Sequence, residues 1–193
     1  MNFNISLPDW AVEELEKLPE CLPTVEDRMR EVIRFSKLNI EHQTGGPFAA
    51  GVFEKETGRM VVIGVNCVVP SNCSSAHAEI MALSLAQQIL GTWDLGAEGM
   101  PEYELLTSGQ PCAMCFGSIP WSGIRHVAVS VAGADVEEIA GFDEGPVHPD
   151  WVGELEKRGI TVTEHVLREE GLEVFRSYRD SGQLVYNGRA GAA

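Results

Sequence analysis

Two short motifs carry residue types that bind a transition metal. One holds His77 and Glu79, separated by one residue, and the other holds Cys112 and Cys115, separated by two. Two thiolates at positions i and i+3 of a first helical turn share one face, and the positive helix terminus lowers their pKa values. Two thiolates and an imidazole are ligands that Zn²⁺ prefers. The residues predict one zinc ion per chain, held by His77, Cys112 and Cys115.

Three protein ligands are typical of a catalytic zinc site, because a structural site uses four and leaves no position for water. Zinc acidifies a bound water. Glu79 lies two residues from His77, where its carboxylate can accept the proton of that water and deliver it to a substrate. We therefore expect Glu79 to act as general acid and base, not as a ligand. Either motif alone also fits a redox pair or a structural histidine, but together, in this order, they favour a catalytic site.

The hydrophobic pattern predicts the elements that position these motifs. Strands are expected at 48–53, 60–65, 104–107, 125–131 and 160–163, and helices at about 24–40, 77–90, 112–121 and 169–180. The first two strands form a hairpin, and the later alternation of strand and helix predicts parallel strands with crossovers. Each motif begins a helix that follows a strand, so both lie at one end of the sheet. The expected fold class is α/β, a sandwich with a mixed sheet.

The chain length and composition fit one globular domain. There are 193 residues, of which 44% are hydrophobic. Residues 1–23 are acidic, contain prolines and carry only a brief helical pattern at 10–15, so they are interpreted as an N-terminal arm. Thr24 is a predicted N-cap with Asp27 three residues later. The domain proper is expected to span 24–193, with 184–193 left over after the last helix.

The charge balance and the cysteines limit the classes of partner. Acidic residues number 29 against 14 basic ones, and the net charge of -15 should repel phosphate backbones, so long nucleic acid is not expected. No apolar run reaches about 20 residues, and the first residues are not basic, so a cytoplasmic chain without a membrane partner is expected. Five cysteines, an odd number, suit a reducing compartment. Cys21, Cys67 and Cys73 are not assigned to the metal.

The two motifs together match the signature of zinc nucleobase deaminases. From about Thr24 to its end, the chain resembles the purine-directed branch of the cytidine deaminase superfamily, most closely the bacterial guanine deaminases. The resemblance also covers residues 46–50, Asn66, Met114, Phe116, 141–146 and 186–187. It implies a three-layer α/β/α sandwich with a five-stranded mixed sheet, a zinc ion, and a homodimer in which the C-terminal segment of one subunit covers the active site of the other.

The resemblance implies hydrolytic deamination of guanine to xanthine and ammonia. Guanine presents two donors, N1–H and the exocyclic amine, beside the acceptor O6, so its pocket should offer carboxylates. Asp143 and Glu144 supply two, although either alone also fits a solvated acid. The resemblance favours Glu144 as a second catalytic glutamate. Asn66 offers an amide to the purine, and Phe48 and Tyr186 complete the predicted substrate-binding set, with Phe48 fitting the core equally well.

Other substrates and another class of function remain open at this point. Guanosine, the triazine ammeline, cytosine and the wobble adenosine of tRNA contain related amino-substituted rings, and the sequence does not separate base from nucleoside. The tRNA substrate would need a basic track, which the chain lacks. A non-enzymatic zinc or thiol-redox module is the alternative from a different class. Outside the motifs, His126 is expected to be structural, and Trp121 is expected in the core.

Overall fold

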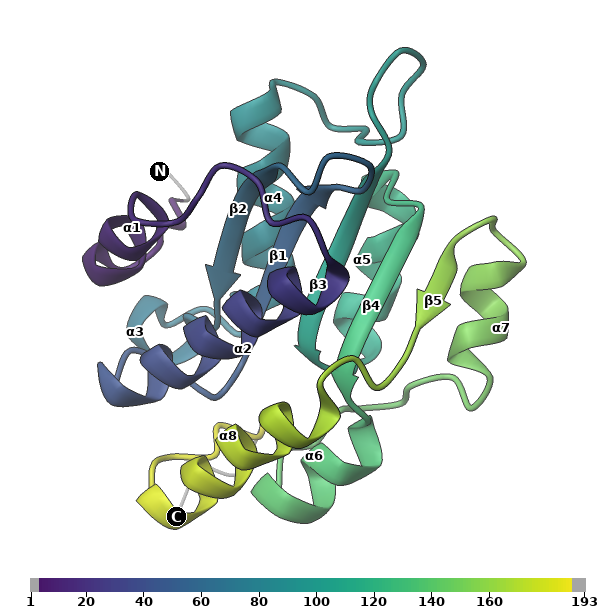
Figure 1. The fold of residues 1–193 in the computed structure, drawn as a ribbon. Coiled ribbons are helices and arrows are strands. Elements are labelled where there is room, and N and C mark those ends of the chain that lie inside the picture. Colours follow the sequence, from purple (N-terminus) through teal and green to yellow (C-terminus); the bar gives the residue numbers. More distant parts are fainter. Residues whose placement is uncertain (1–3, 189–193) are drawn as a thin grey trace.

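A five-stranded sheet, in the order β2-β1-β3-β4-β5, forms the middle layer of the molecule (Figure 1). The computed structural model describes residues 4–188. The strands are β1 (Ala49–Glu54), β2 (Met60–Val65), β3 (Tyr103–Gly109), β4 (His126–Val131) and β5 (Thr161–Thr163). Strand β1 is antiparallel to β2 and β3, whereas β3, β4 and β5 are parallel. The predicted mixed sheet is confirmed, but β1 separates β2 from β3, so only the last three strands are parallel neighbours.

Helices cover both faces of this sheet and complete a three-layer sandwich. Helices α2, α6 and α8 lie on one face, and α4 and α5 lie on the other (Figure 1). The bounds of the helices are α1 (Asp9–Leu15), α2 (Val25–Glu41), α3 (Val68–Ser71), α4 (Ala78–Leu90), α5 (Ala113–Ser122), α6 (Gly133–Ala140), α7 (Trp151–Glu156) and α8 (Arg168–Ser181). None of those in the described part of the chain is long and apolar enough to cross a bilayer.

Local sequence signals explain where the main helices begin and end. Thr24 caps α2 as expected, because its Oγ1 accepts a hydrogen bond from the backbone N of Asp27 at 3.1 Å. Helices α4 and α5 end at Gly91 and Gly123, both in the left-handed conformation that glycine adopts without strain. Between the helices, alternate strand residues point to opposite layers, as Phe53 and its preceding neighbour Val52 illustrate. The local sequence therefore sets where α2 begins, where α4 and α5 end, and which strand residues face each layer.

The predicted N-terminal arm packs against the sheet. Ala11 in α1 is fully buried. The backbone N of Leu22 donates to the oxygen of Gly58 at 2.9 Å, and the N of Met60 donates to the oxygen of Glu20 at 3.0 Å. The described part of the arm is thus held on β2 and on the turn that precedes it.

Two features differ from the sequence expectations, and a third agrees with them. Helices α6 and α7 form in a region where no element was predicted. Trp121 was expected in the core, but it is 85% exposed because it lies on the outer face of α5. His126 does have the structural role expected of it, with its ring nitrogens 2.7 Å from Thr161 Oγ1 and 2.9 Å from Glu102 Oε2.

Candidate metal centre and active site

Two helix N-termini meet at the end of the sheet where the site lies. His77 is the N-cap residue of α4, and Cys112 is the N-cap residue of α5. Neither side chain caps its own helix, so both are free to face the gap between the helices. Gly64 in β2 lets α4 approach closely, since a Cβ there would lie 2.6 Å from the backbone N of Ala82. The positive ends of the two helices favour negatively charged groups at this place.

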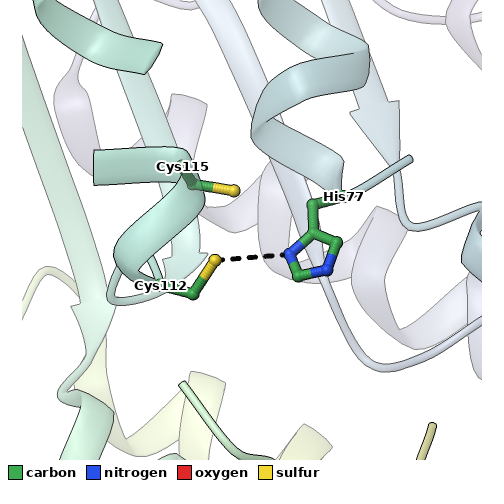
Figure 2. Close-up of side chains that lie close together, drawn as sticks. All are labelled: His77, Cys112 and Cys115. Atoms are coloured by element: carbon green, nitrogen blue, oxygen red, sulfur yellow. Dashed lines mark hydrogen bonds between the residues drawn. The ribbon is translucent and has the colours of Figure 1, made fainter. Parts of the chain in front are cut away.

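The three predicted metal ligands lie together. One ligand atom from each of His77, Cys112 and Cys115 lies within 4.8 Å of the others, and His77 Nδ1 is 3.5 Å from Cys112 Sγ (Figure 2). A tetrahedral zinc ion with bonds of roughly 2.0 to 2.3 Å separates its ligands by roughly 3.5 Å. Within residues 4–188 this is the one His, Cys, Asp or Glu group with metal-binding geometry. The donor types and their spacing fit zinc, and a site with three protein ligands would leave one position for water.

The cluster shifts the pKa values of its own thiols. A hydrogen bond from Cys115 lowers the pKa of the Cys112 thiol to about 4, an effect that burial opposes and His77 supports. The same hydrogen bond, together with burial, raises the pKa of Cys115. The pair therefore already stabilises one thiolate, which is the form that binds metal.

Two buried carboxylates flank the cluster. Glu79 is 6% exposed and Glu144 is 8% exposed, and both line the same cavity. Burial is the main cause that raises the pKa of Glu79 to about 7 and that of Glu144 to about 8. The backbone oxygen of Glu144 accepts a hydrogen bond from the N of Ala113 at 3.0 Å, which fixes Glu144 beside the start of α5. Glu79 stands outside the ligand group, as expected.

A cavity of about 190 Å³ opens in front of these residues. Every predicted site residue except Cys115, which lies beneath it, contributes to its wall. Two other wall residues, Phe142 and Asn187, lie in segments that carry the family resemblance, but no role was predicted for them. The sequence did not single out the remaining wall residues, namely Val68, Ser74, Ala78, Gln110 and Gly188. Gln110 lies two residues before Cys112, and Ser74 lies three residues before His77. Their closeness in sequence to the two motifs is the signal that could have placed them in the cavity wall.

Aromatic rings form the apolar side of the cavity. The Phe142 ring lies 4.9 Å from the Phe48 ring and 5.1 Å from the Tyr186 ring, measured between centroids. Phe48 also packs against Phe175 in the core, with the ring centroids 5.4 Å apart, so it both lines the cavity and belongs to the core. Flat walls of this kind suit a planar ring.

Asn66 and Tyr186 meet across the cavity. Asn66 is 1% exposed, and its Nδ2 donates to the Tyr186 hydroxyl at 2.6 Å. Its Oδ1 accepts weakly from the backbone N of Gly46 at 3.4 Å and of Val68 at 3.3 Å. The remaining amide hydrogen is therefore the group that Asn66 can offer to a ligand. A Cβ on Gly46 would lie 2.9 Å from the Tyr186 ring, so the glycine at this position lets the Tyr186 ring lie close to the backbone beside the cavity.

Asp143 lies at the rim of the cavity. Its side chain is exposed, and its Oδ1 accepts a hydrogen bond from the backbone N of Gly145 at 2.9 Å, which stabilises a local turn. The next residue, Glu144, points into the cavity and is buried. The structure thus separates two adjacent acids that the sequence could not rank by geometry.

Comparison with known proteins identifies the family. Residues 23–131 match the cytidine and deoxycytidylate deaminase zinc-binding region. The chain belongs to the cytidine and deoxycytidylate deaminase family. This deaminase is therefore a zinc-dependent hydrolytic enzyme, and the cluster of His77, Cys112 and Cys115 lies within the matched region.

Two guanine deaminases are among the relatives of this deaminase. It is 35% identical to guanine deaminase of Bacillus subtilis over 127 residues, which cover 63% of this chain and 76% of that protein. Its structure matches that of guanine deaminase from Nitrosomonas europaea with a TM-score of 0.88 and 47% identity, covering 93% of this chain and 98% of the other. A structure in complex with 2,6-diaminopurine matches with a TM-score of 0.89 and 47% identity, covering 95% and 96%.

Proposed function

We propose that this deaminase removes the amine of guanine by hydrolysis, giving xanthine and ammonia. The observation that carries the proposal is the pair of buried carboxylates, Glu79 and Glu144, facing one small cavity beside the metal cluster. The likeness to two guanine deaminases and to a structure holding a diaminopurine supports the choice of ring.

The two carboxylates divide the proton transfers. Zinc bound by His77, Cys112 and Cys115 supplies a Lewis acid that acidifies the attacking water. Glu79 accepts a proton from that water as its oxygen bonds to C2 of guanine, and passes the proton to a ring nitrogen. Glu144 binds the exocyclic amine and helps to pass it the second proton of the water, which leaves the new hydroxyl on C2 as the carbonyl forms and the bond between C2 and nitrogen breaks. Water and guanine thus yield xanthine and ammonia, with no other reactant.

The shape of the cavity favours a free base. A volume of about 190 Å³ is below the roughly 300 to 1,000 Å³ of pockets for drug-sized ligands, and Tyr186 covers the opening through its contact with Asn66. A ribose or an RNA strand would have to displace this cover. The net charge of -15 also opposes binding of a tRNA backbone. We therefore rank guanine above guanosine and tRNA adenosine. In this account Asn66 donates its free amide hydrogen to the purine, Phe48 and Tyr186 contact the ring, and Asp143 shapes the rim.

Ammonia release tests the substrate. The zinc-loaded protein is incubated separately with guanine, guanosine, ammeline, cytosine and adenine, and ammonia is measured in each. Guanine should give the highest kcat/KM. A higher value for guanosine or cytosine would refute the assignment of guanine, and no release from any ring would refute the enzymatic proposal.

We also propose a homodimer formed through α4 and α5. Large exposed apolar side chains lie on these helices and on the loop after α4, with Trp121 in α5 85% exposed, Ile89 in α4 61% and Trp93 in the loop 78%. Beside Trp121 lies a groove between the two helices that Ile80 and Leu83 help to line. A protruding ring next to an apolar groove on one face suits a two-fold interface, in which each copy presents both features to the other.

The C-terminal segment reaches the cavity of its own chain, so we propose that each protomer closes its own site. Mixing two inactive variants separates this arrangement from an exchanged one. Glu79→Gln lacks the proton acceptor, and Tyr186→Ala lacks the cover. Refolded together, they should give no more activity than the two alone. Recovery toward one quarter of wild-type activity or more would show that the segment is exchanged between subunits, as the family resemblance implied.

A further inference from the structure

A chain of hydrogen bonds connects the N-terminal helix to the wall of the active-site cavity. Trp10 Nε1 in α1 donates to Thr44 Oγ1 at 2.9 Å, and Thr44 Oγ1 donates to Asn39 Oδ1 at 2.7 Å. Asn39 Nδ2 in turn donates to the backbone oxygens of Gly46 and Asn66, each at 2.9 Å. The chain therefore runs from α1, through α2, to Asn66 at the cavity.

Asn39 is the branching point of this chain. Its side chain has no exposed surface. Its amide accepts from one hydroxyl and donates to two carbonyl groups, and a carboxylate or an apolar side chain of the same size cannot make all three bonds. The hydroxyl of Thr44 therefore determines which way the amide is turned, since it donates to the oxygen and leaves the nitrogen to face the two carbonyl groups.

The glycine at position 45 lets the carbonyl of Asn66 approach the side chain of Asn39 closely enough for this hydrogen bond. A Cβ on Gly45 would lie 2.0 Å from the oxygen of Asn66 and 2.7 Å from Asn39 Nδ2. Any other residue there would push Asn66 away from Asn39. On the other side, Trp10 is fixed by its stacking on the His42 ring, with the ring centroids 4.8 Å apart and nearly parallel. Both ends of this series of hydrogen bonds, at Trp10 and at Asn66, are thus held in place.

We propose that Asn39, oriented by Trp10 and Thr44, is a positioning residue for substrate binding. By holding the carbonyl of Asn66, it fixes the place from which the Asn66 side chain meets the ring. The inference rests on the proposed function, which treats Asn66 as a ring contact. It gives the N-terminal arm a part in the active site.

The effect should fall on binding and spare the proton transfers. Glu79 lies at the start of α4, and Glu144 is held by the N of Ala113. The members of the chain are instead on α1, α2 and the loop before β1. Removing a hydrogen bond among Trp10, Thr44 and Asn39 should therefore move Asn66 without moving either carboxylate.

Thr44 is the best position for a test, because it is only half-buried and a matched pair of variants exists. Thr44→Val keeps the size of the side chain and removes the hydroxyl, whereas Thr44→Ser keeps the hydroxyl. With guanine as substrate, Thr44→Val should raise KM roughly 3- to 10-fold, the equivalent of about one lost hydrogen bond, with kcat within about twofold of wild type. Thr44→Ser should have a nearly wild-type KM. Trp10→Phe, which keeps an aromatic ring but removes the indole N–H donor, should also raise KM.

Binding of the product gives an independent readout. The Kd of xanthine, measured by equilibrium titration of the zinc-loaded protein, should rise with KM in Thr44→Val and stay unchanged in Thr44→Ser. Unchanged KM and Kd in Thr44→Val, or an equal loss in both Thr44 variants, would overturn the positioning role while leaving the proposed function intact. A fall in kcat alone would also overturn it. Wild-type protein that releases no ammonia from guanine would instead refute the proposed function.

Discussion

Asn187 fastens the C-terminal segment over the active site, and its removal should open the pocket. Its Oδ1 accepts a hydrogen bond from the backbone N of Asp143 at 2.9 Å, and its Nδ2 donates to the oxygen of Gly141 at 2.8 Å. Both partners belong to the loop that carries Glu144. Asn187→Ala removes both bonds at once and leaves Tyr186 with its single bond to Asn66.

The expected magnitude follows from these two bonds. Each contributes a net of about 0.5 to 1.5 kcal/mol, and the lower part of that range applies because the site is partly exposed to water. A combined loss of about 1 to 2 kcal/mol lowers the closed population relative to the open one roughly 5- to 30-fold. If guanine is converted only in the closed pocket, kcat/KM for guanine should fall by up to this factor.

Steady-state kinetics of Asn187→Ala, with zinc content measured in parallel, checks this prediction. Gln183→Ala is the matched control. It also removes a tail hydrogen bond, from Nε2 to the oxygen of Ile40 at 3.1 Å, but that bond lies away from the cavity. The control should keep wild-type kcat/KM and zinc. A wild-type value in Asn187→Ala, or an equal fall in both variants, would refute the idea that these two bonds close the pocket.

Three further predictions concern the other parts of the protein. Cys112→Ala should abolish stoichiometric zinc in elemental analysis, since two ligands remain, and retained zinc would contradict the ligand assignment. Glu144→Gln should lower kcat for guanine by less than the roughly 10² to 10⁴-fold that loss of a general acid and base costs. Asp143→Asn, one residue away at the exposed rim, should change kcat little, and equal effects would contradict the separate roles. Trp121→Glu should convert a dimer into a species of 21.0 kDa in light scattering, and an unchanged mass would remove α5 from the interface.

Short-range signals made the metal cluster predictable from sequence. A metal site needs particular side chains at helix starts, and the spacing of Cys112 and Cys115 encodes that directly. The cap at Thr24 and the main strands were predictable for the same reason, because each depends on neighbouring residues. The expected mixed sheet and three-layer fold are confirmed by the structure.

Features that depend on distant contacts were not predictable in this way. Trp121 was expected in the core, because an apolar residue on a helix gives no sign of which face meets the sheet, and it lies outside. The part played by Asn39 depends on carbonyl groups 7 and 27 residues away in sequence. Asp143 and Glu144 are equivalent acids until the turn at Gly145 directs one outward and the other inward.

The central claim is that a zinc-loaded site uses Glu79 to deaminate guanine, and one comparison tests it most directly. Wild-type protein and Glu79→Gln are prepared with equal zinc content, and the rate of conversion of guanine to xanthine and ammonia is measured for both. The amide keeps the shape of the side chain but cannot accept a proton, so kcat should fall roughly 10² to 10⁴-fold with zinc retained. Conversion at the wild-type rate in Glu79→Gln would contradict the account.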